Sequence, residues 1–360
     1  MPVVRVDLAE RAYEVIVESG LLSNAGQVIA NAGLSGRKAA IITDETVASL
    51  HSAALISSLE AAGFSPTLHL VPAGEASKSL GQSEKLCREM TQAGHDRKSF
   101  VIALGGGVVG DLAGFVAAIF YRGIPFVQIP TTIVAQVDSS IGGKTGVNIS
   151  EGKNLVGAFH QPALVIVDPE TLRTLPAREF NEGFAEAIKH AAIRDAAMVE
   201  ELAALDPASR DVPADLIARN IAIKARVVEE DEHELKDVRA LLNFGHTIGH
   251  GIEAAVPYGE MLHGEAISLG IRAALYLSEK HAGLSSDDSR KILDLLARYD
   301  LPLILPASIA TEIVLEKLAR DKKFSAGAIR FVVLDAIGSA KVIKTITTGD
   351  ILEAIEHLRS

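Results

Sequence analysis

Three histidines lie close together in the second half of the chain. His246 and His250 are four residues apart, and His263 follows shortly after, at the start of another helical run. Residues four apart lie on one face of a helix. Two histidines and one carboxylate form a common catalytic zinc set, which leaves one coordination position open for a substrate. The sequence therefore predicts a divalent-metal site in this half of the chain.

An earlier segment offers the carboxylate that such a site needs. Glu186 and Lys189 are three residues apart and fall on one helical face. Spacing alone does not decide which histidines bind the metal. His246 and His250 can both be ligands, as in H-E-x-x-H peptidases, but no glutamate follows His246, and this disfavours a peptidase. A single buried histidine is more often a core residue, whereas three in a glycine-punctuated stretch favour the metal site.

A glycine-rich turn carries a second kind of chemistry. An apolar run at 100–104 leads into Gly105, Gly107 and Gly110, which match the G-x-G-x-x-G spacing, and a helical pattern follows. Glycines let the backbone approach a pyrophosphate, and the helix N-terminus supplies N–H donors and the positive end of a dipole. The pattern predicts a dinucleotide site. A tight turn needed only for packing is the alternative.

The acid that holds the ribose is not in its usual place. It normally lies about 20 residues beyond the glycines, but no acid occurs between Asp111 and Asp138. Asp44 closes an upstream strand, 38–43. If NAD binds, we expect Asp44 to hold its adenosine ribose, in a variant of the usual topology.

A second glycine cluster, 138–145, resembles a P-loop only at its end. Gly143-Lys144-Thr145 fits that motif, but the first glycine would have to occupy position 138, which is Asp138. The P-loop interpretation therefore fails. What remains is a polar, cationic loop with an acid, suited to a substrate that carries hydroxyls and negative charge.

The elements that must position these residues form two groups. The runs 3–8 and 13–17 predict an antiparallel pair of strands, and 38–43, 67–71, 100–104, 126–129 and 164–167 predict further strands, with helices at 46–62 and 79–93. Strands separated by helices predict a largely parallel sheet that binds ligands at the carboxyl ends of its strands. From 179 to about 298 the periodicity is helical, with a small β patch at 330–334 and 341–345. We predict an α/β fold, with an NAD-binding domain over 1–176 and a mainly helical metal- and substrate-binding domain over 177–360.

Composition limits the possible partners. A chain of 360 residues exceeds one ordinary core of about 100 to 200 residues, so two domains with a cleft are expected. The net charge of −11 argues against nucleic acid and anionic membranes. The single cysteine, Cys87, fits a reducing compartment. The N-terminus does not resemble a signal peptide, and the most apolar stretch, 112–121, is too short to cross a bilayer. We expect a cytoplasmic protein.

Together, these segments resemble the 3-dehydroquinate synthase family. The motifs recur in order from Asp44 to Lys323, over most of the chain. They are Pro72-x-Gly74-Glu75-x-x-Lys78, the triple glycine with Asp111, Tyr121-Arg122-Gly123, Pro130-Thr131-Thr132, the loop 138–144, Gly152-Lys153-Asn154, Glu186 with Lys189, the paired histidines, His263-Gly264-Glu265 and Asp321-Lys322-Lys323.

The resemblance implies a specific ligand set and a specific NAD site. It implies Glu186, His246 and His263 as ligands of zinc or cobalt, and it leaves His250 free as a catalytic residue. The residues that it implies for NAD are Asp44, Glu75, Lys78, Gly106, Gly107, Asp111, Thr131, Thr132, Lys144, Lys153 and Thr174.

The resemblance also implies a phosphorylated keto-acid substrate. Its carboxylate would face Arg239 and Lys224, and its hydroxyls would meet Asp138, Lys189 and the metal. Its phosphate would meet Lys144, Asn154, Asn243, His250 and Lys322 (or Lys323), with Arg122 from the neighbouring subunit of a homodimer. The implied catalytic residues are His250, Lys189, Asp138, Lys144, Asn243 and Arg239. These residue types suit the substrate, since arginine forks bind carboxylates and amines bind phosphates.

The implied activity is that of a lyase of the shikimate pathway. It converts 3-deoxy-D-arabino-heptulosonate 7-phosphate to 3-dehydroquinate and phosphate, and it uses NAD without net redox change. A sister cyclase that makes another carbocycle is the first alternative, and Arg239 discriminates against it because its substrates lack a carboxylate. A metal-dependent NAD alcohol or glycerol dehydrogenase would not need the cations Lys144, Lys224, Arg239 and Lys322. A non-catalytic NAD-binding module would leave the histidines unexplained.

Overall fold

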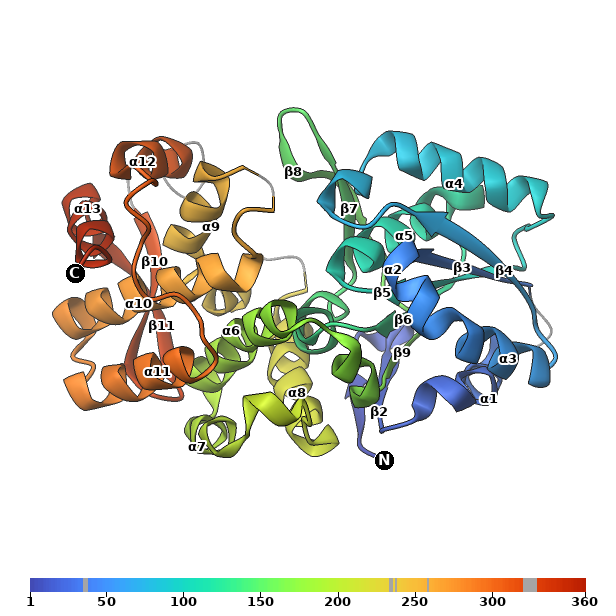
Figure 1. The fold of residues 1–360 in the computed structure, drawn as a ribbon, viewed down its shortest axis with the longest axis horizontal. Helices are drawn as coiled ribbons and strands as arrows, with labels where there is room; N and C mark the ends of the chain where they lie inside the picture. The colour runs from blue at the N-terminus through green and yellow to red at the C-terminus, as the bar shows by residue number, and fades with distance from the viewer. Residues whose placement is uncertain (35–37, 233–235, 237, 258, 320–328) are drawn as a thin grey trace. The chain divides into compact units, whose positions relative to one another are not determined.

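The chain folds into two compact units, shown as a ribbon in Figure 1. The structure is a computed structural model that describes residues 1–34, 38–232, 236, 238–257, 259–319 and 329–360. The first unit comprises Met1–Leu175 and Asp211–Glu229, and the second comprises Pro176–Arg210 and Glu230–Ser360. The predicted division at residue 176 falls beside the first boundary, but it does not anticipate that 211–229 returns to the first unit.

A seven-stranded sheet organises the first unit, with strand order β1-β2-β9-β6-β5-β3-β4. Its strands are β1 (Val3–Val6), β2 (Tyr13–Val17), β3 (Lys38–Asp44), β4 (Ser65–Val71), β5 (Phe100–Gly105), β6 (Phe126–Pro130) and β9 (Leu164–Val167). β1 and β2 pair antiparallel, and all other pairs are parallel. The predicted antiparallel pair and the predicted parallel strands are confirmed, with bounds that agree within two residues.

Both faces of this sheet are covered by helices. Alternate residues of a strand point to opposite faces, so Ala39 and Ile41 join the core under α1 (Ala25–Ile29) and α3 (Ala53–Ala61), while Ala40 and Ile42 join the core under α4 (Leu80–Gln92) and α5 (Gly107–Ile119). The predicted helix 46–62 consists of α2 (Glu45–Val47), a π-helical turn and α3. Burial on both faces explains why the parallel strands are continuous apolar runs.

The strand order changes direction between β3 and β5. The chain passes from β3 to β4 on one side, and from β5 to β6 and then β9 on the other. Open α/β sheets bind ligands at the carboxyl ends of the strands on either side of such a switch point. The topology therefore points to the ends of β3 and β5, at Asp44 and Gly105, as the place for a nucleotide.

Two further elements complete the first unit. β7 (Lys144–Ile149) and β8 (Gly152–Phe159) form an antiparallel hairpin, and β7 contacts α5. The helix α8 (Ala214–Glu230) lies far along the chain, yet almost all of it belongs to this unit.

Helices dominate the second unit. They are α6 (Ala177–Arg194), α7 (Ala196–Ala204), α9 (His246–Ala255), α10 (His263–Ala282), α11 (Ser286–Arg298), α12 (Thr311–Ala319) and α13 (Thr348–His357), with the 3-10 helix η10 (Arg239–Asn243) before α9. α10 packs against α6, α9 and α13. The strands β10 (Ile329–Ala336) and β11 (Ser339–Ile346) pair antiparallel, and this confirms the predicted β patch. No helix in the described part of the chain is long and apolar enough to span a membrane.

Close contact between α9 and α10 depends on glycine. Gly245 precedes α9 with φ of +77°, a left-handed conformation that glycine adopts without strain. A Cβ atom on Gly270 of α10 would lie 1.9 Å from the carbonyl oxygen of Gly245. Because the two backbones touch at this point, α9 is held against α10 directly beside His246.

Candidate metal centre and nucleotide-binding edge

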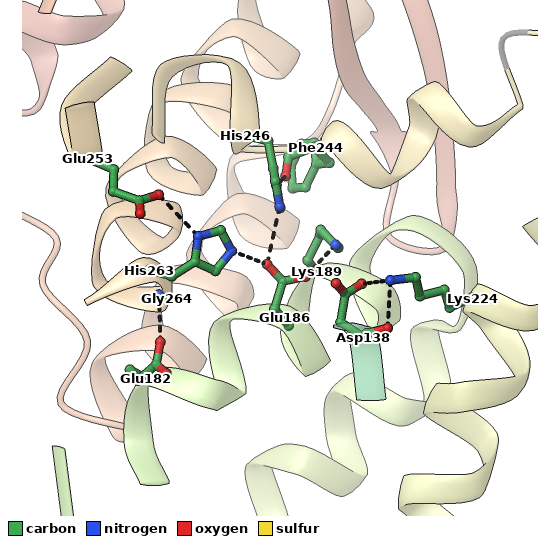
Figure 2. A network of polar contacts seen from close by, with 10 residues as sticks. All are labelled: Asp138, Glu182, Glu186, Lys189, Lys224, Phe244, His246, Glu253, His263 and Gly264. Atoms are coloured by element: carbon green, nitrogen blue, oxygen red, sulfur yellow. Dashed lines mark hydrogen bonds and ion pairs between the residues drawn. The ribbon is translucent and has the colours of Figure 1, made fainter. Parts of the chain in front are cut away.

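Three helices of the second unit bring Glu186, His246 and His263 together. Glu186 lies on α6, and its Oε1 is 3.2 Å from His246 Nε2 and 3.1 Å from His263 Nε2 (Figure 2). His246 and His263 are the first residues of α9 and α10. One ligand atom from each of the three residues lies within 4.8 Å of the others. This donor set, with two imidazole nitrogens and one carboxylate, suits zinc or cobalt.

The second ring nitrogen of each histidine is also occupied. His246 Nδ1 is 3.1 Å from the carbonyl oxygen of Phe244, and His263 Nδ1 is 3.2 Å from Glu253 Oε2. A carbonyl oxygen only accepts hydrogen bonds, so Nδ1 of His246 carries the proton and Nε2 keeps its lone pair. Histidine ligands of metals are usually oriented in this way, by a carbonyl or a carboxylate on the other nitrogen.

The charges at this cluster fit a bound cation. Burial would lower the pKa of His263, but hydrogen bonds to Glu186 and Glu253 outweigh it and raise the pKa to about 10. Burial would raise the pKa of Glu186, but Lys189 and His246 hold it well below its usual range. The cluster thus stabilises positive charge beside an ionised carboxylate. A divalent ion bound here would take the place of the His263 proton.

Lys189 lies on the same face of α6 as Glu186. Its ammonium contacts Glu186 Oε2, the carboxylate oxygen that does not contact the histidines. Only 1% of either side chain is exposed. A buried charge needs a partner, and this pair satisfies both groups.

The predicted residues His250, Asn243 and Arg239 belong to the same unit. The His250 ring centroid lies 5.0 Å from that of His246 and 5.9 Å from that of His263. Asn243 ends η10, which packs against α6 and α9. Arg239 begins η10 and is buried, and its Nη1 donates to the carbonyl oxygen of Glu232 at 2.7 Å.

Two carboxylates near this cluster were not predicted. Glu253 contacts His263 as described, and Glu182 Oε2 accepts a 2.6 Å hydrogen bond from the backbone N–H of Gly264, at the start of α10. Burial raises the pKa of Glu182 to about 7. Helix periodicity could have found both, since Glu182 is four residues before Glu186 and Glu253 is three residues after His250.

The predicted NAD-binding residues follow the ends of neighbouring strands in the first unit. Parallel strands end at one edge of a sheet, so residues that come directly after them gather there. Asp44 ends β3, Glu75 and Lys78 follow β4, Gly106 and Gly107 follow β5, Thr131 and Thr132 follow β6, and Thr174 follows β9. Asp111 lies in the second turn of α5.

The N-terminus of α5 has the features of a phosphate site. Gly106 is its N-cap, and no side chain forms a capping hydrogen bond there. The first backbone N–H groups of a helix need a partner, and an anion supplies one. Thr131 directly follows the neighbouring strand β6, and its Oγ1 is buried without a hydrogen-bond partner among the described residues. A buried, unpaired hydroxyl at this edge fits a polar ligand.

Several of these residues have polar partners within the first unit, and Lys78 and Asp111 contact each other. Lys78 Nζ lies 2.5 Å from Asp111 Oδ2. Asp44 caps α2 by accepting hydrogen bonds from the backbone N–H groups of Thr46 and Val47 on its Oδ1. Thr174 Oγ1 lies 3.0 Å from the Nε2 of His51.

Lys224 reaches Asp138 inside the first unit. Its Nζ is 2.8 Å from Asp138 Oδ1 and donates to the Asp138 carbonyl oxygen at 2.7 Å (Figure 2). Lys224 is carried by α8, and Asp138 by the π-helical turn η7 (Ala135–Ser139). The return of α8 to this unit therefore places a predicted carboxylate-binding lysine beside a predicted hydroxyl-binding acid.

The remaining predicted residues are exposed or lie outside the described residues. Lys144 begins β7, and Lys153 and Asn154 lie near the start of β8. Arg122 is exposed, with φ of +70°. Lys322 and Lys323 lie outside the described residues, so the choice between them stays open.

The sequence matches two known family descriptions in consecutive parts of the chain. Residues 68–182 match the family described as 3-dehydroquinate synthase N-terminal, and residues 183–324 match the one described as 3-dehydroquinate synthase C-terminal. The chain belongs to the 3-dehydroquinate synthase family. The predicted resemblance is confirmed.

The similarity to 3-dehydroquinate synthases extends over nearly the whole chain. The 3-dehydroquinate synthase of Pelobacter propionicus is 45% identical over 95% of this chain and 96% of its own length. That of Symbiobacterium thermophilum is also 45% identical, over 98% of this chain and 100% of its own length.

Solved structures share the fold. The 2-epi-5-epi-valiolone synthase ValA of Streptomyces hygroscopicus, with NAD+ and Zn2+ bound, is 30% identical with a TM-score of 0.87, covering 96% of each chain. A glycerol dehydrogenase of Schizosaccharomyces pombe is 16% identical with a TM-score of 0.65, covering 96% of this chain and 88% of that one, and shows the fold alone. The predicted fold class, a largely parallel α/β part followed by a mainly helical part, is confirmed.

Proposed function

We propose that the chain is a 3-dehydroquinate synthase, a lyase of the shikimate pathway that depends on NAD and a divalent metal. It converts 3-deoxy-D-arabino-heptulosonate 7-phosphate to 3-dehydroquinate and phosphate. The observation that carries the proposal is the cluster of Glu186, His246 and His263, in a chain 45% identical to proteins of this name over nearly their whole length. The NAD+ and Zn2+ in the related valiolone synthase structure support both cofactors.

The two units divide the cofactors between them. Glu186, His246 and His263 of the second unit would hold zinc or cobalt, and the strand ends of the first unit would hold NAD. When bound, the metal polarises a substrate hydroxyl, and NAD accepts a hydride from that carbon and later returns it. The first N–H groups of α5, after Gly106 and Gly107, would bind the pyrophosphate.

Other residues of the same edge would complete the NAD site. Asp44 would hold the adenosine ribose, with its Oδ1 fixed by its two backbone hydrogen bonds. Thr131 would find in NAD a partner for its buried hydroxyl. The others that we assign to NAD are Glu75, Lys78, Asp111, Thr132, Lys144, Lys153 and Thr174.

The substrate would be held by groups that match its own. Arg239 and Lys224 would bind the carboxylate, and Asp138 and Lys189 would orient hydroxyls by hydrogen bonds. The phosphate would meet Lys144, Asn154, Asn243, His250 and Lys322. The His250 imidazole would also move a proton, because histidine is the side chain that most often serves as a general acid or base.

The carboxylate contact distinguishes this activity from that of a sister cyclase. A buried arginine–carboxylate fork is worth about 2 to 5 kcal/mol when one partner is removed, by analogy with buried interfacial pairs. Arg239→Ala should therefore lower kcat/KM on the heptulosonate phosphate by at least roughly thirtyfold, and Arg239→Lys should retain more activity. Phosphate release measures this effect. The matched comparison uses a heptulose phosphate that lacks the carboxylate, on which Arg239→Ala should change kcat/KM little.

Two related activities remain as alternatives. The valiolone synthase likeness, at 30% identity and a TM-score of 0.87, is the observation that favours a sister cyclase. A wild-type preference for the substrate without a carboxylate would establish that alternative. A dehydrogenase shares the fold at 16% identity, but it has no use for the set of cations assigned to the substrate.

We further propose that the enzyme acts in the cytoplasm as a homodimer, with Arg122 of one subunit serving its partner's site. Tyr121 and Arg122 have φ of +50° and +70°, and Arg122 is exposed. A left-handed backbone at two bulky residues in succession is unfavourable and is often found at functional segments. The net charge of −11 argues against nucleic acid or an anionic membrane as a further partner.

Subunit mixing tests the role of Arg122. Arg122→Ala and His263→Ala should each be nearly inactive alone. In a heterodimer of the two, one site receives His263 from its own subunit and Arg122 from the other, so a random mixture should recover about a quarter of wild-type activity. If the mixture recovers no activity while heterodimers form, Arg122 serves its own subunit or none.

A further inference from the structure

Asn148 links two residues that the proposed function assigns to different ligands. It lies on β7, and its Nδ2 donates to Glu75 Oε1 at 2.7 Å. Its Oδ1 accepts a hydrogen bond from the backbone N–H of Asn154 at 2.9 Å. Its own backbone N–H donates to the carbonyl oxygen of Lys78 at 2.9 Å. All four residues belong to the first unit.

The primary amide of Asn148 satisfies both side-chain contacts at once. The Glu75 carboxylate accepts hydrogen bonds, whereas the backbone N–H of Asn154 donates one. Asn148 offers an N–H donor to the first and an oxygen acceptor to the second. Aspartate would place two carboxylates against each other, and alanine would leave both partners without this contact.

The two residues that contact the Asn148 side chain lie in a short 3-10 helix and at an exposed position of the hairpin. Glu75 begins a three-residue 3-10 helix after β4, and Asn154 lies in the hairpin of β7 and β8. Asn154 also has φ of +56°, a left-handed conformation that asparagine adopts more readily than most residues and that a backbone hydrogen bond can restrain further. The hydrogen bond to its N–H is such a restraint.

We propose that Asn148 is a positioning residue that couples the NAD subsite to the subsite for the substrate phosphate. It sets the Glu75 carboxylate, on the NAD side, at a fixed place relative to Asn154, on the phosphate side. An anion bound at Asn154 then orders Glu75 for NAD, and NAD bound at Glu75 orders Asn154 for the anion. This inference rests on the proposed function, which assigns Glu75 and Asn154 to those two ligands.

Binding measurements on the metal-loaded enzyme test the coupling. The dissociation constant of NAD is measured by calorimetry with and without saturating inorganic phosphate. Wild-type enzyme should bind NAD more tightly when phosphate is present. Asn148→Ala should weaken NAD binding about tenfold, as expected for the loss of hydrogen bonds to charged and backbone groups, and phosphate should no longer change it. Asn31→Ala, at an exposed asparagine that accepts a hydrogen bond from Gln27, is the matched control and should behave like wild type.

Exchanging the amide and the carboxylate between Asn148 and Glu75 distinguishes a positioning role of Asn148 from a general loss of structure. Asn148→Asp should raise the KM for the heptulosonate phosphate more than Asn148→Ala does, because its carboxylate faces that of Glu75. Combining Asn148→Asp with Glu75→Gln lets the new amide donate to the new carboxylate, which can still accept the Asn154 N–H. The double variant should therefore have a lower KM than Asn148→Asp alone. The single variant Glu75→Gln measures the effect of losing the Glu75 carboxylate by itself.

The outcomes distinguish this inference from the proposed function. If wild-type enzyme binds NAD and releases phosphate but Asn148→Ala keeps both the NAD affinity and its response to phosphate, the coupling is wrong and the function stands. If the double variant has a KM as high as that of Asn148→Asp alone, the positioning role is wrong. This comparison decides the matter even where Asn148→Ala does not fold. A wild-type protein that does not bind NAD would overturn both.

Discussion

Replacing His263 with alanine should yield a protein that retains neither zinc nor cobalt and has lost nearly all activity. The variant removes one of the three proposed ligands, and the two that remain, Glu186 and His246, are too few for a stable catalytic site. It also leaves Glu253 without the ring that it contacts at 3.2 Å. Metal analysis of the purified protein, with the absorption spectrum of added cobalt, measures the loss without relying on activity.

Variants of two residues near the proposed ligands serve as controls, because they should affect metal binding less than His263→Ala does. His250→Ala should keep the metal but turn over slowly, because His250 is assigned to proton and phosphate handling rather than to ligation. Glu253→Gln should bind metal about 10- to 100-fold more weakly, as is typical when the partner of a ligating histidine is altered. A metal-free His250→Ala, or a fully loaded His263→Ala, would show that the ligand set is wrong.

Enzyme freed of NAD should release no phosphate, and a small amount of NAD should restore many turnovers. The reason is that the hydride removed from the substrate is returned to it before the product leaves. Elimination of phosphate needs a ketone one carbon from the C–H bond that breaks, so the cofactor must stay bound beside the intermediate. The number of phosphates released per NAD added measures this directly. A ratio that never exceeds one would show that NAD is consumed.

The strands were predictable because burial imposes a simple pattern. Residues 100–104 and 164–167 are continuous apolar runs, and in the structure both faces of these strands are covered. The glycine-rich turn was predictable for a similar reason, since a Cβ atom on Gly105 would lie 2.8 Å from Val109 Cβ and one on Gly110 would lie 2.7 Å from Gln128 Oε1. Patterns of this kind lie within one segment, and a single sequence displays them.

The site was predictable only in part from residue types and spacing. The spacing left open which of His246, His250 and His263 bind the metal, and the resemblance to a family implied the choice. The structure then places the Nε2 atoms of His246 and His263 against Glu186. Glu253 was overlooked although helix spacing places it on the face of His246 and His250, because a glutamate on a helix is usually a solvated surface residue.

Contacts between distant segments left no signal in the sequence. Lys224 and Asp138 are 86 residues apart. No periodicity in the sequence indicates that α8 returns to the first unit. Asn148 is similar, since its contact with Glu75 spans 73 residues. Such pairs depend on the register of whole elements, and they become visible only when those elements are placed together.

The stoichiometry of one reaction tests the proposed function most directly. Purified enzyme with zinc or cobalt and a sub-stoichiometric amount of NAD is given the heptulosonate phosphate, and inorganic phosphate and NADH absorbance are followed together. The proposed function predicts one phosphate released for each substrate consumed, while NADH absorbance stays at or below the level that the bound cofactor accounts for. Accumulation of free NADH in step with substrate loss, without phosphate release, would contradict it and leave a dehydrogenase.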